Sequence, residues 1–111
     1  MVSPSAGTVV LVPFPYSDLS HSKLRPAVVL GFAGRDDWIL CQITSKSYTD
    51  SHAIGISDSD FSKGSLQLVS YARPGKLFTA HTDLFRREIG CLKKSSLDKI
   101  IGAVVSLLKS P

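Results

Sequence analysis

The fold of this chain is decided by three stretches near its start: GTVVLVPFPYSD at residues 7–18, KLRPAVVL at 23–30 and ILCQITS at 39–45. Each contains a run of β-branched and other apolar residues, which favours a strand. Pro13 and Pro15 are expected to end the first strand, because proline cannot donate to a strand ladder. A polar loop over 16–24 then leads to a second strand at 25–31, and a third strand at 38–43 completes a meander.

The rest of the chain predicts shorter strands and one helix. Strands are expected at 53–56, 66–73, 77–79 and 88–92, with a break at Pro74-Gly75 and one helical turn at 58–63. Apolar residues recur at helical spacing over 96–109, and Ser95-Ser96-Leu97-Asp98 at the start of this stretch resembles a capping box. Short strands without βαβ alternation predict a mainly β chain, a small antiparallel barrel with a C-terminal helix.

The composition of the chain limits the classes of protein to which it can belong. The 111 residues fit one domain, 1–111, and 43% hydrophobic residues allow a packed core. A net charge of +4 favours an anionic partner such as nucleic acid, although it is also ordinary for a soluble domain. Cys41 and Cys91 lack metal-ligand spacing, so reduced thiols are expected rather than a zinc site. With no secretory signal pattern at the start, a cytoplasmic location is predicted.

Two strand ends carry candidate phosphate-binding groups. Arg25 opens the second strand, and Pro26 behind it restricts its backbone to extended conformations. A guanidinium held in this way can bind a phosphate, or it can be a surface cation paired with Asp18 or solvated. Thr44 and Ser45 end the third strand, where their hydroxyls either donate to a phosphate or bond the local backbone.

These groups suit RNA cleavage by the substrate's own 2′-hydroxyl. That reaction needs a base for the 2′ proton, an acid for the leaving oxygen and positive charge at the phosphorane. Further positive charge, or alternatively a solvated rim, is available at Arg73, Lys76, Arg86 and Arg87. Unpaired bases can stack on Phe14, Tyr16 or Tyr71. The histidines His21, His52 and His81 are too scattered to predict an acid–base pair. Without a P-loop, GxSxG or HExxH motif, no cofactor or metal is expected.

The chain resembles the PemK/MazF family of toxin endoribonucleases over nearly its whole length. The resemblance lies in the three opening stretches together with Asp60-Phe61, Gly64-Ser65-Leu66, the run from Ser70 to Thr79 and Ile89-Gly90-Cys91-Leu92. It implies an SH3-like barrel of the CcdB/MazF toxin type that forms a homodimer. It also implies a metal-independent ribonuclease that cuts single-stranded mRNA to a 2′,3′-cyclic phosphate and a 5′-hydroxyl, and a cognate antitoxin protein.

The same resemblance assigns roles to individual residues. Arg25 matches the catalytic arginine, Thr44 matches the hydroxyl that holds the phosphate, and Arg73 matches a second arginine used as an acid or phosphate contact. The loop over 16–24 matches the border of the RNA groove. RNA contacts are therefore expected from Tyr16, Ser17, His21, Lys23, Ser45, Lys76 and Thr79.

Two positions depart from the family pattern. Thr8 stands where many members have an acidic residue, and Gly75 stands where the PemK branch carries a proposed general base. The base is therefore unassigned, with His21 as a substitute.

Two other functions stay open: a CcdB-like inhibitor that binds gyrase without catalysis, and a degenerate paralogue that binds RNA or antitoxin. A toxicity that survives Arg25→Ala would favour the first of these.

Overall fold

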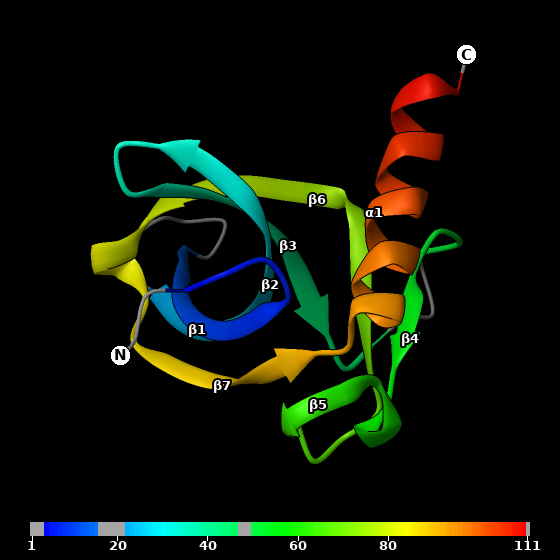
Figure 1. The fold of residues 1–111 in the computed structure, drawn as a ribbon, viewed down its shortest axis with the longest axis horizontal. Helices are drawn as coiled ribbons and strands as arrows, with labels where there is room; N and C mark the ends of the chain where they lie inside the picture. Colours follow the sequence, from blue (N-terminus) through cyan, green and yellow to red (C-terminus); the bar gives the residue numbers. More distant parts are fainter. Residues whose placement is uncertain (1–3, 16–21, 47–49, 111) are drawn as a thin grey trace.

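The computed structural model describes residues 4–15, 22–46 and 50–110, and in these residues it shows one curled antiparallel sheet with a C-terminal helix (Figure 1). The strands are β1 (Thr8–Pro15), β2 (Ser22–Gly34), β3 (Asp37–Thr44), β4 (Ile54–Ile56), β5 (Phe61–Gly64), β6 (Ser70–His81) and β7 (Arg87–Leu92). The helices are the short η1 (Asp58–Asp60) and η2 (Thr82–Leu84) and the long α1 (Lys94–Lys109). The sheet order is β4-β6-β3-β2-β1-β7-β5, so the predicted meander and mainly β architecture are confirmed.

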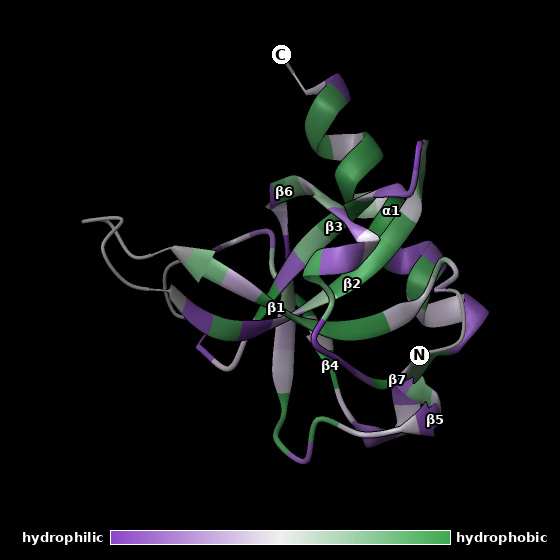
Figure 2. Ribbon diagram, turned by 90° about the vertical axis from the view of Figure 1, so that its left-hand side faces the viewer, coloured by the Kyte–Doolittle hydropathy of each residue, from purple (hydrophilic) through white to green (hydrophobic). Residues whose placement is uncertain are grey.

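The central strands are buried on both faces, which explains their uninterrupted apolar runs. One core contains Val9, Val28 and Cys41 and is covered by Leu97 and Ile100 of α1. The other lies on the opposite face and is made by Val10, Val12, Ala27, Val29, Leu40, Ala80 and Phe85. We call this second cluster the outer core. Figure 2 shows the apolar colouring that runs through β1 and β2 at the middle of the sheet.

The prediction that Pro13 ends the first strand is wrong. β1 continues through Pro13 and Pro15, which pair with Leu24 and Ser22 of β2. The carbonyl of Leu11 accepts the N–H of Arg86, on the edge of β1 that faces away from β2. Strand alternation turns the nitrogens of Pro13 and Pro15 to this same edge, so no bond to β2 is lost. Because β2 begins at Ser22, the last three residues of the predicted loop belong to a strand, and 16–21 lie outside the described residues.

The turn predicted at 33–37 is a tight hairpin. Arg35 and Asp36 have φ angles of 54° and 63°, and Gly34 pairs with Asp37. Two successive left-handed residues match the twist of the strands that they join. β2 therefore extends three residues beyond its predicted end.

β6 is one strand, although Pro74 and Gly75 were expected to break it. Its pairing with β3 jumps from Leu77↔Cys41 to Ala72↔Ile43, so 73–76 form a bulge. The bulge accommodates the proline without ending the strand. The strand begins only at Ser70, and Gln67, with a φ of 65°, lies in the turn before it. Residues 61–63, which were predicted to be part of a helical turn, belong to β5 instead.

The helix begins at Lys94, earlier than predicted, and the prediction of a capping box at 95–98 is wrong. Lys93 is the N-cap and provides no side-chain cap. Ser96 instead donates to the Asp60 carboxylate at 2.7 Å, while the Lys93 N–H donates to the Asp60 carbonyl at 2.8 Å. The Ser57 N–H and the Ser96 hydroxyl hold the pKa of Asp60 below its usual value. The start of α1 is therefore tied to η1 rather than capped locally.

In the described residues, no helix has the length and apolar character needed to cross a membrane. Both cysteines are free thiols, Cys41 in the core and Cys91 half-buried.

Candidate active site

Arg25 lies inside β2 rather than at its start, opposite Val12 of β1. It shares a face of the strand with Ala27 and Val29, two members of the outer core. Its side chain is half-buried. The guanidinium therefore stands at the rim of an apolar core, held by strands on a rigid sheet rather than by a loop.

Pro26 ends the ladder between β2 and β3 next to Arg25. The β2–β3 pairing begins at Ala27↔Gln42, and strand alternation turns the Pro26 nitrogen toward β3, where proline has no hydrogen to donate. Continuing the register by two residues sets Thr44 across from Arg25, on the same face. The β2–β3 ladder ends before this position, so Arg25 and Thr44 lie just beyond its last pair.

The Thr44 hydroxyl is oriented by the local backbone. Its oxygen accepts the Lys46 N–H at 3.1 Å. This is the local backbone bond considered from the sequence, and it leaves the hydroxyl proton available, because a hydroxyl donates once and accepts twice. Thr44 also pairs with Tyr71 of β6. Ser45 follows the strand and is exposed.

Arg73 lies in the β6 bulge and is held by an acidic partner that the sequence did not indicate. Its Nε donates to Asp50 Oδ2 at 2.9 Å, and the His52 N–H donates to Asp50 Oδ1 at 2.9 Å. These bonds hold the pKa of Asp50 below its usual value, with the Arg73 bond the largest cause. The Arg73 carbonyl accepts the Cys41 thiol at 3.1 Å. Burial raises the pKa of Cys41 to about 11, so it stays a neutral thiol.

Asp50 is suited to hold Arg73 and ill suited to be a base. Both of its oxygens already accept hydrogen bonds, and a lowered pKa weakens its attraction for a proton. Among the described residues, the side chain of Arg73 bonds through Nε alone, and its two terminal amino groups can donate to other ligands.

Asp50→Asn is expected to lower the free energy of unfolding by about 1–2 kcal/mol at pH 7, because a charge-assisted hydrogen bond is weakened. The side chains of Arg73 and Asp50 are 27% and 13% exposed, so solvent screens the pair little. A depressed carboxyl pKa stabilises the fold above the unfolded pKa near 4, and this contribution is lost as pH falls through the folded value. Urea titrations at pH 7 and pH 3 should show the difference between the proteins shrinking in acid.

Asp98→Asn is the matched control for that measurement. Its pair with Lys94 is 3.0 Å long, but the two side chains are 57% and 85% exposed. Its loss should change stability by less than about 0.5 kcal/mol. Equal effects of the two substitutions would contradict the structural role of Asp50.

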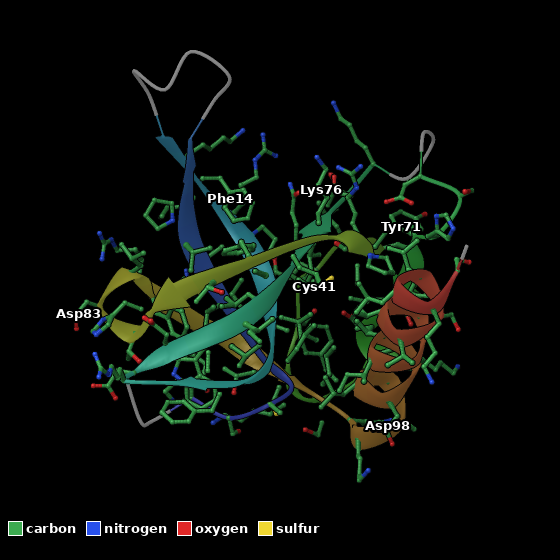
Figure 3. The ribbon with its side chains drawn as sticks, turned by 90° about the horizontal axis from the view of Figure 1, so that it is seen from above. Phe14, Cys41, Tyr71, Lys76, Asp83 and Asp98 are labelled. Carbon is green, nitrogen blue, oxygen red and sulfur yellow. The ribbon has the colours of Figure 1, made fainter. Side chains whose placement is uncertain are left out.

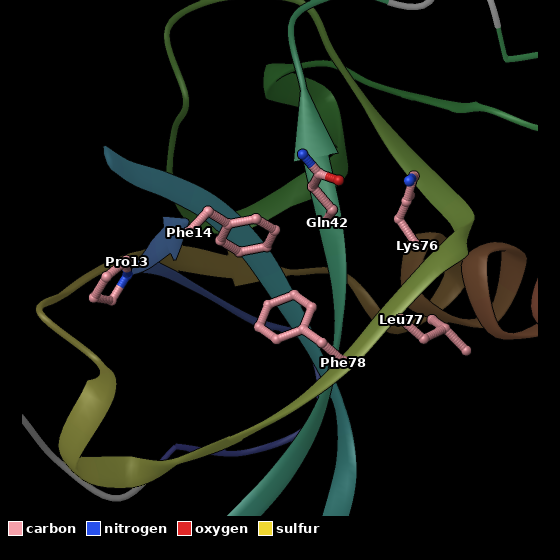
Figure 4. A pocket seen from close by; sticks show the side chains of 6 residues that line it. All are labelled: Pro13, Phe14, Gln42, Lys76, Leu77 and Phe78. Carbon is pink, nitrogen blue, oxygen red and sulfur yellow. The ribbon is translucent and has the colours of Figure 1, made fainter. Parts of the chain in front are cut away.

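A pocket opens beside Arg25 and Thr44 on the same face of the sheet. It is lined by Pro13, Phe14, Gln42, Lys76, Leu77 and Phe78, and has a volume of about 200 Å³. The Phe14 and Phe78 rings meet edge to face, with centroids 4.6 Å apart and planes at 84° (Figure 4). Figure 3 shows Phe14, Lys76 and Tyr71 along one side of the molecule.

The other predicted RNA contacts divide into three groups. Lys23 is exposed and pairs with Phe14, beside the pocket, and Lys76 lines the pocket. Thr79 pairs with Ile39, and alternation along β6 turns it to the face opposite Phe78. Tyr16, Ser17 and His21 lie outside the described residues.

Two other candidates, Arg86 and His81, are bonded to Asp83. Arg86 donates to the Asp83 carbonyl at 2.8 Å, and His81 accepts the Asp83 N–H at 3.1 Å. Both bonds belong to the segment around η2. Three residues of the site, Asp50, Gln42 and Phe78, were not predicted from the sequence. Gln42 could have been found, because it is a polar residue between the apolar Cys41 and Ile43 of a strand.

A family model for the "PemK-like, MazF-like toxin of type II toxin-antitoxin system" matches residues 5–108. The chain belongs to this toxin family. The recognition made from the sequence is thereby confirmed, and the PemK/MazF-type toxins are a family of endoribonucleases. No curated protein sequence matches the chain.

Solved structures of PemK/MazF-type toxins share the fold. A MazE–MazF structure from Deinococcus radiodurans has a TM-score of 0.78 at 17% identity, covering 100% of both chains. A MazF structure from the same organism has a TM-score of 0.76 at 19% identity, covering 99% of this chain and 100% of that one. An endoribonuclease with its cognate antitoxin from a mycobacterial species has a TM-score of 0.74 at 17% identity, covering 100% and 98%. The predicted CcdB/MazF-type barrel is confirmed.

Proposed function

We propose that this PemK/MazF-type toxin is a metal-independent endoribonuclease that cuts single-stranded mRNA through the RNA 2′-hydroxyl. The observation that supports this most is the β2–β3 register, which ends at Ala27↔Gln42 and, continued by two residues, sets Arg25 and Thr44 opposite one another on one face. A fixed cation and an oriented hydroxyl on one rigid sheet suit a phosphate that gains negative charge in the transition state.

Each group has a defined part in the reaction. The 2′-oxygen attacks phosphorus, the bond from phosphorus to the 5′-oxygen breaks, and a 2′,3′-cyclic phosphate and a 5′-hydroxyl result. Arg25 neutralises the phosphorane oxygens and Thr44 donates its hydroxyl proton to one of them. Arg73, held by Asp50, contributes a second cation or protonates the leaving 5′-oxygen. His21 is our candidate base for the 2′ proton, since imidazole titrates near neutral pH.

Two partners belong to the proposal. Two similar solved structures are an endoribonuclease in complex with its cognate antitoxin and a MazE–MazF structure, and they support a cognate antitoxin protein for this chain. An antitoxin segment that covers the face with Arg25 and Lys76 would block RNA. Family membership also supports a homodimer.

Incubation of the purified protein with a long single-stranded RNA in EDTA, beside Arg25→Ala, tests the proposal. Discrete cuts that end in cyclic phosphate, and that weaken in the variant, are expected. Binding of RNA by the wild type without any cutting would overturn it in favour of a non-catalytic paralogue. Intact RNA with inhibited gyrase would point to the CcdB-like function.

A further inference from the structure

We propose that the pocket beside Arg25 binds one unpaired nucleobase next to the cleaved phosphate, and that Gln42 reads the edge of that base. This inference rests on the proposed nuclease function and adds a specificity determinant to it. The pocket is the cavity that lies on the same face as Arg25 and Thr44, and its lining is both aromatic and polar.

The size of the pocket fits a single ring system. Its volume of about 200 Å³ is smaller than the roughly 300–1,000 Å³ typical of sites for drug-sized ligands. A flat base fits such a space, whereas a whole nucleotide does not, so the sugar and phosphate stay outside. The reacting phosphate would then lie on the sheet surface, where Arg25 and Thr44 are.

The pocket walls offer the contacts that bind unpaired bases. The perpendicular rings of Phe14 and Phe78 present both a ring face and a ring edge, and both pack against the outer core. Single-stranded bases stack on aromatic faces in this way. Since the two rings come from β1 and β6, the sheet holds them in place before any ligand binds.

Gln42 supplies a polar group suited to discriminate between bases. Its amide combines two N–H donors and one carbonyl acceptor, so it can pair with a neighbouring donor and acceptor on a base edge. Figure 4 shows this amide beside the Phe14 ring, with Lys76 on the opposite wall. Lys76 is exposed and can bind a backbone phosphate at the mouth without reading sequence.

The location links the base to the scissile phosphate. Gln42 and Thr44 lie two residues apart on one face of β3, which is about 7 Å along the strand. Phe14 is likewise two residues from Val12, the partner of Arg25 in β1. The base in the pocket therefore belongs to a nucleotide that adjoins the phosphate at Arg25 and Thr44.

The test compares the cut sites of the wild type and Gln42→Leu on an RNA of mixed sequence, by sequencing the product ends. Leucine fills a similar volume on an apolar wall, so the fold is retained. The wild type should prefer one base at a fixed position adjoining the cut, and the variant should lose that preference roughly tenfold or more while still cutting. Gln67→Asn, in the turn before β6, is the control and should keep the wild-type preference.

A base preference unchanged in Gln42→Leu would overturn the proposal. That is also the result expected if the pocket instead receives an apolar side chain of an antitoxin.

A binding measurement separates failure of the base-pocket proposal from failure of the proposed nuclease function. Four labelled single-stranded DNA hexamers, one for each base, lack the 2′-hydroxyl and cannot be cut. The wild type should bind one of them more tightly, and Gln42→Leu should reduce the difference; equal binding of all four by the wild type would overturn the base pocket even if RNA is cut.

Discussion

Arg25→Ala is expected to slow RNA cleavage by roughly 10²–10³-fold, the usual cost of removing one group that stabilises charge in the transition state. The arginine lies beside Thr44 at the end of the β2–β3 ladder, where it reaches a phosphate on the sheet surface. Single-turnover rates with excess protein measure the effect on the cleavage step. The fold should survive, because Arg25 is half-buried at the rim of the outer core rather than inside it.

Arg25→Lys separates charge from geometry. Lysine keeps the positive charge but lacks the planar fork of donors that matches two phosphate oxygens. We expect it to recover part of the lost rate and to remain slower than the wild type. A rate for Arg25→Ala equal to that of the wild type, with an unchanged melting temperature, would remove Arg25 from the reaction.

Gly64→Ala is expected to cause the largest loss of stability, about 3 kcal/mol or more. Gly64 has a φ of +77°, which costs an alanine about 1–2 kcal/mol, and the forced packing adds about 1–3 kcal/mol. A Cβ at this position would collide with the Ile89 carbonyl oxygen and lie 2.7 Å from Gly90 Cα. These are backbone atoms of β7, so β5 would have to move away. Thermal unfolding should show Tm falling by roughly 10 °C or more.

Gly102→Ala is the matched control for this substitution. Gly102 lies in α1, and among the described residues a Cβ added there meets no atom within 4 Å beyond the neighbouring backbone of its own helix. Alanine should raise stability by about 0.5–1 kcal/mol through its higher helix propensity. A loss of stability in Gly64→Ala together with a gain in Gly102→Ala would show that the effect at Gly64 comes from its place in the fold. A Gly64→Ala variant with unchanged stability would show that β5 and β7 are not packed as described.

The sequence predicted the strands best where apolar runs are long, and least well at proline. Pro13, Pro15 and Pro74 each indicate a strand end by their missing N–H. Each is tolerated for a reason that depends on tertiary structure. Pro13 and Pro15 lie beyond the last pair of β1 with β7 and turn their nitrogens away from β2, and Pro74 lies in a bulge. No local pattern shows which edge of a strand will be paired. The helix start was misplaced similarly, because Ser96 bonds to the distant Asp60 rather than to its own backbone.

Part of the site was visible in the sequence and part was not. Arg25 and Thr44 were predicted at the start of the second strand and after the third, and the antiparallel meander brings these two positions close together on neighbouring central strands. Asp50 could not be assigned, because it is 23 residues from Arg73 and its bond depends on how β6 bulges. The aromatic pair of the pocket joins residues from the first strand and the sixth, so it appears only in the folded sheet.

The central claim is that Arg25 and Thr44 act on the same phosphate, and a double-mutant cycle tests it most directly. Single-turnover cleavage rates of the wild type, Arg25→Ala, Thr44→Val and the double variant give the coupling between the two residues. Valine keeps the shape of threonine and removes its hydroxyl. We predict that the double variant is much less impaired than the product of the two single effects, because groups that act on one phosphate lose their contributions together. Two single effects that multiply in full would contradict the account.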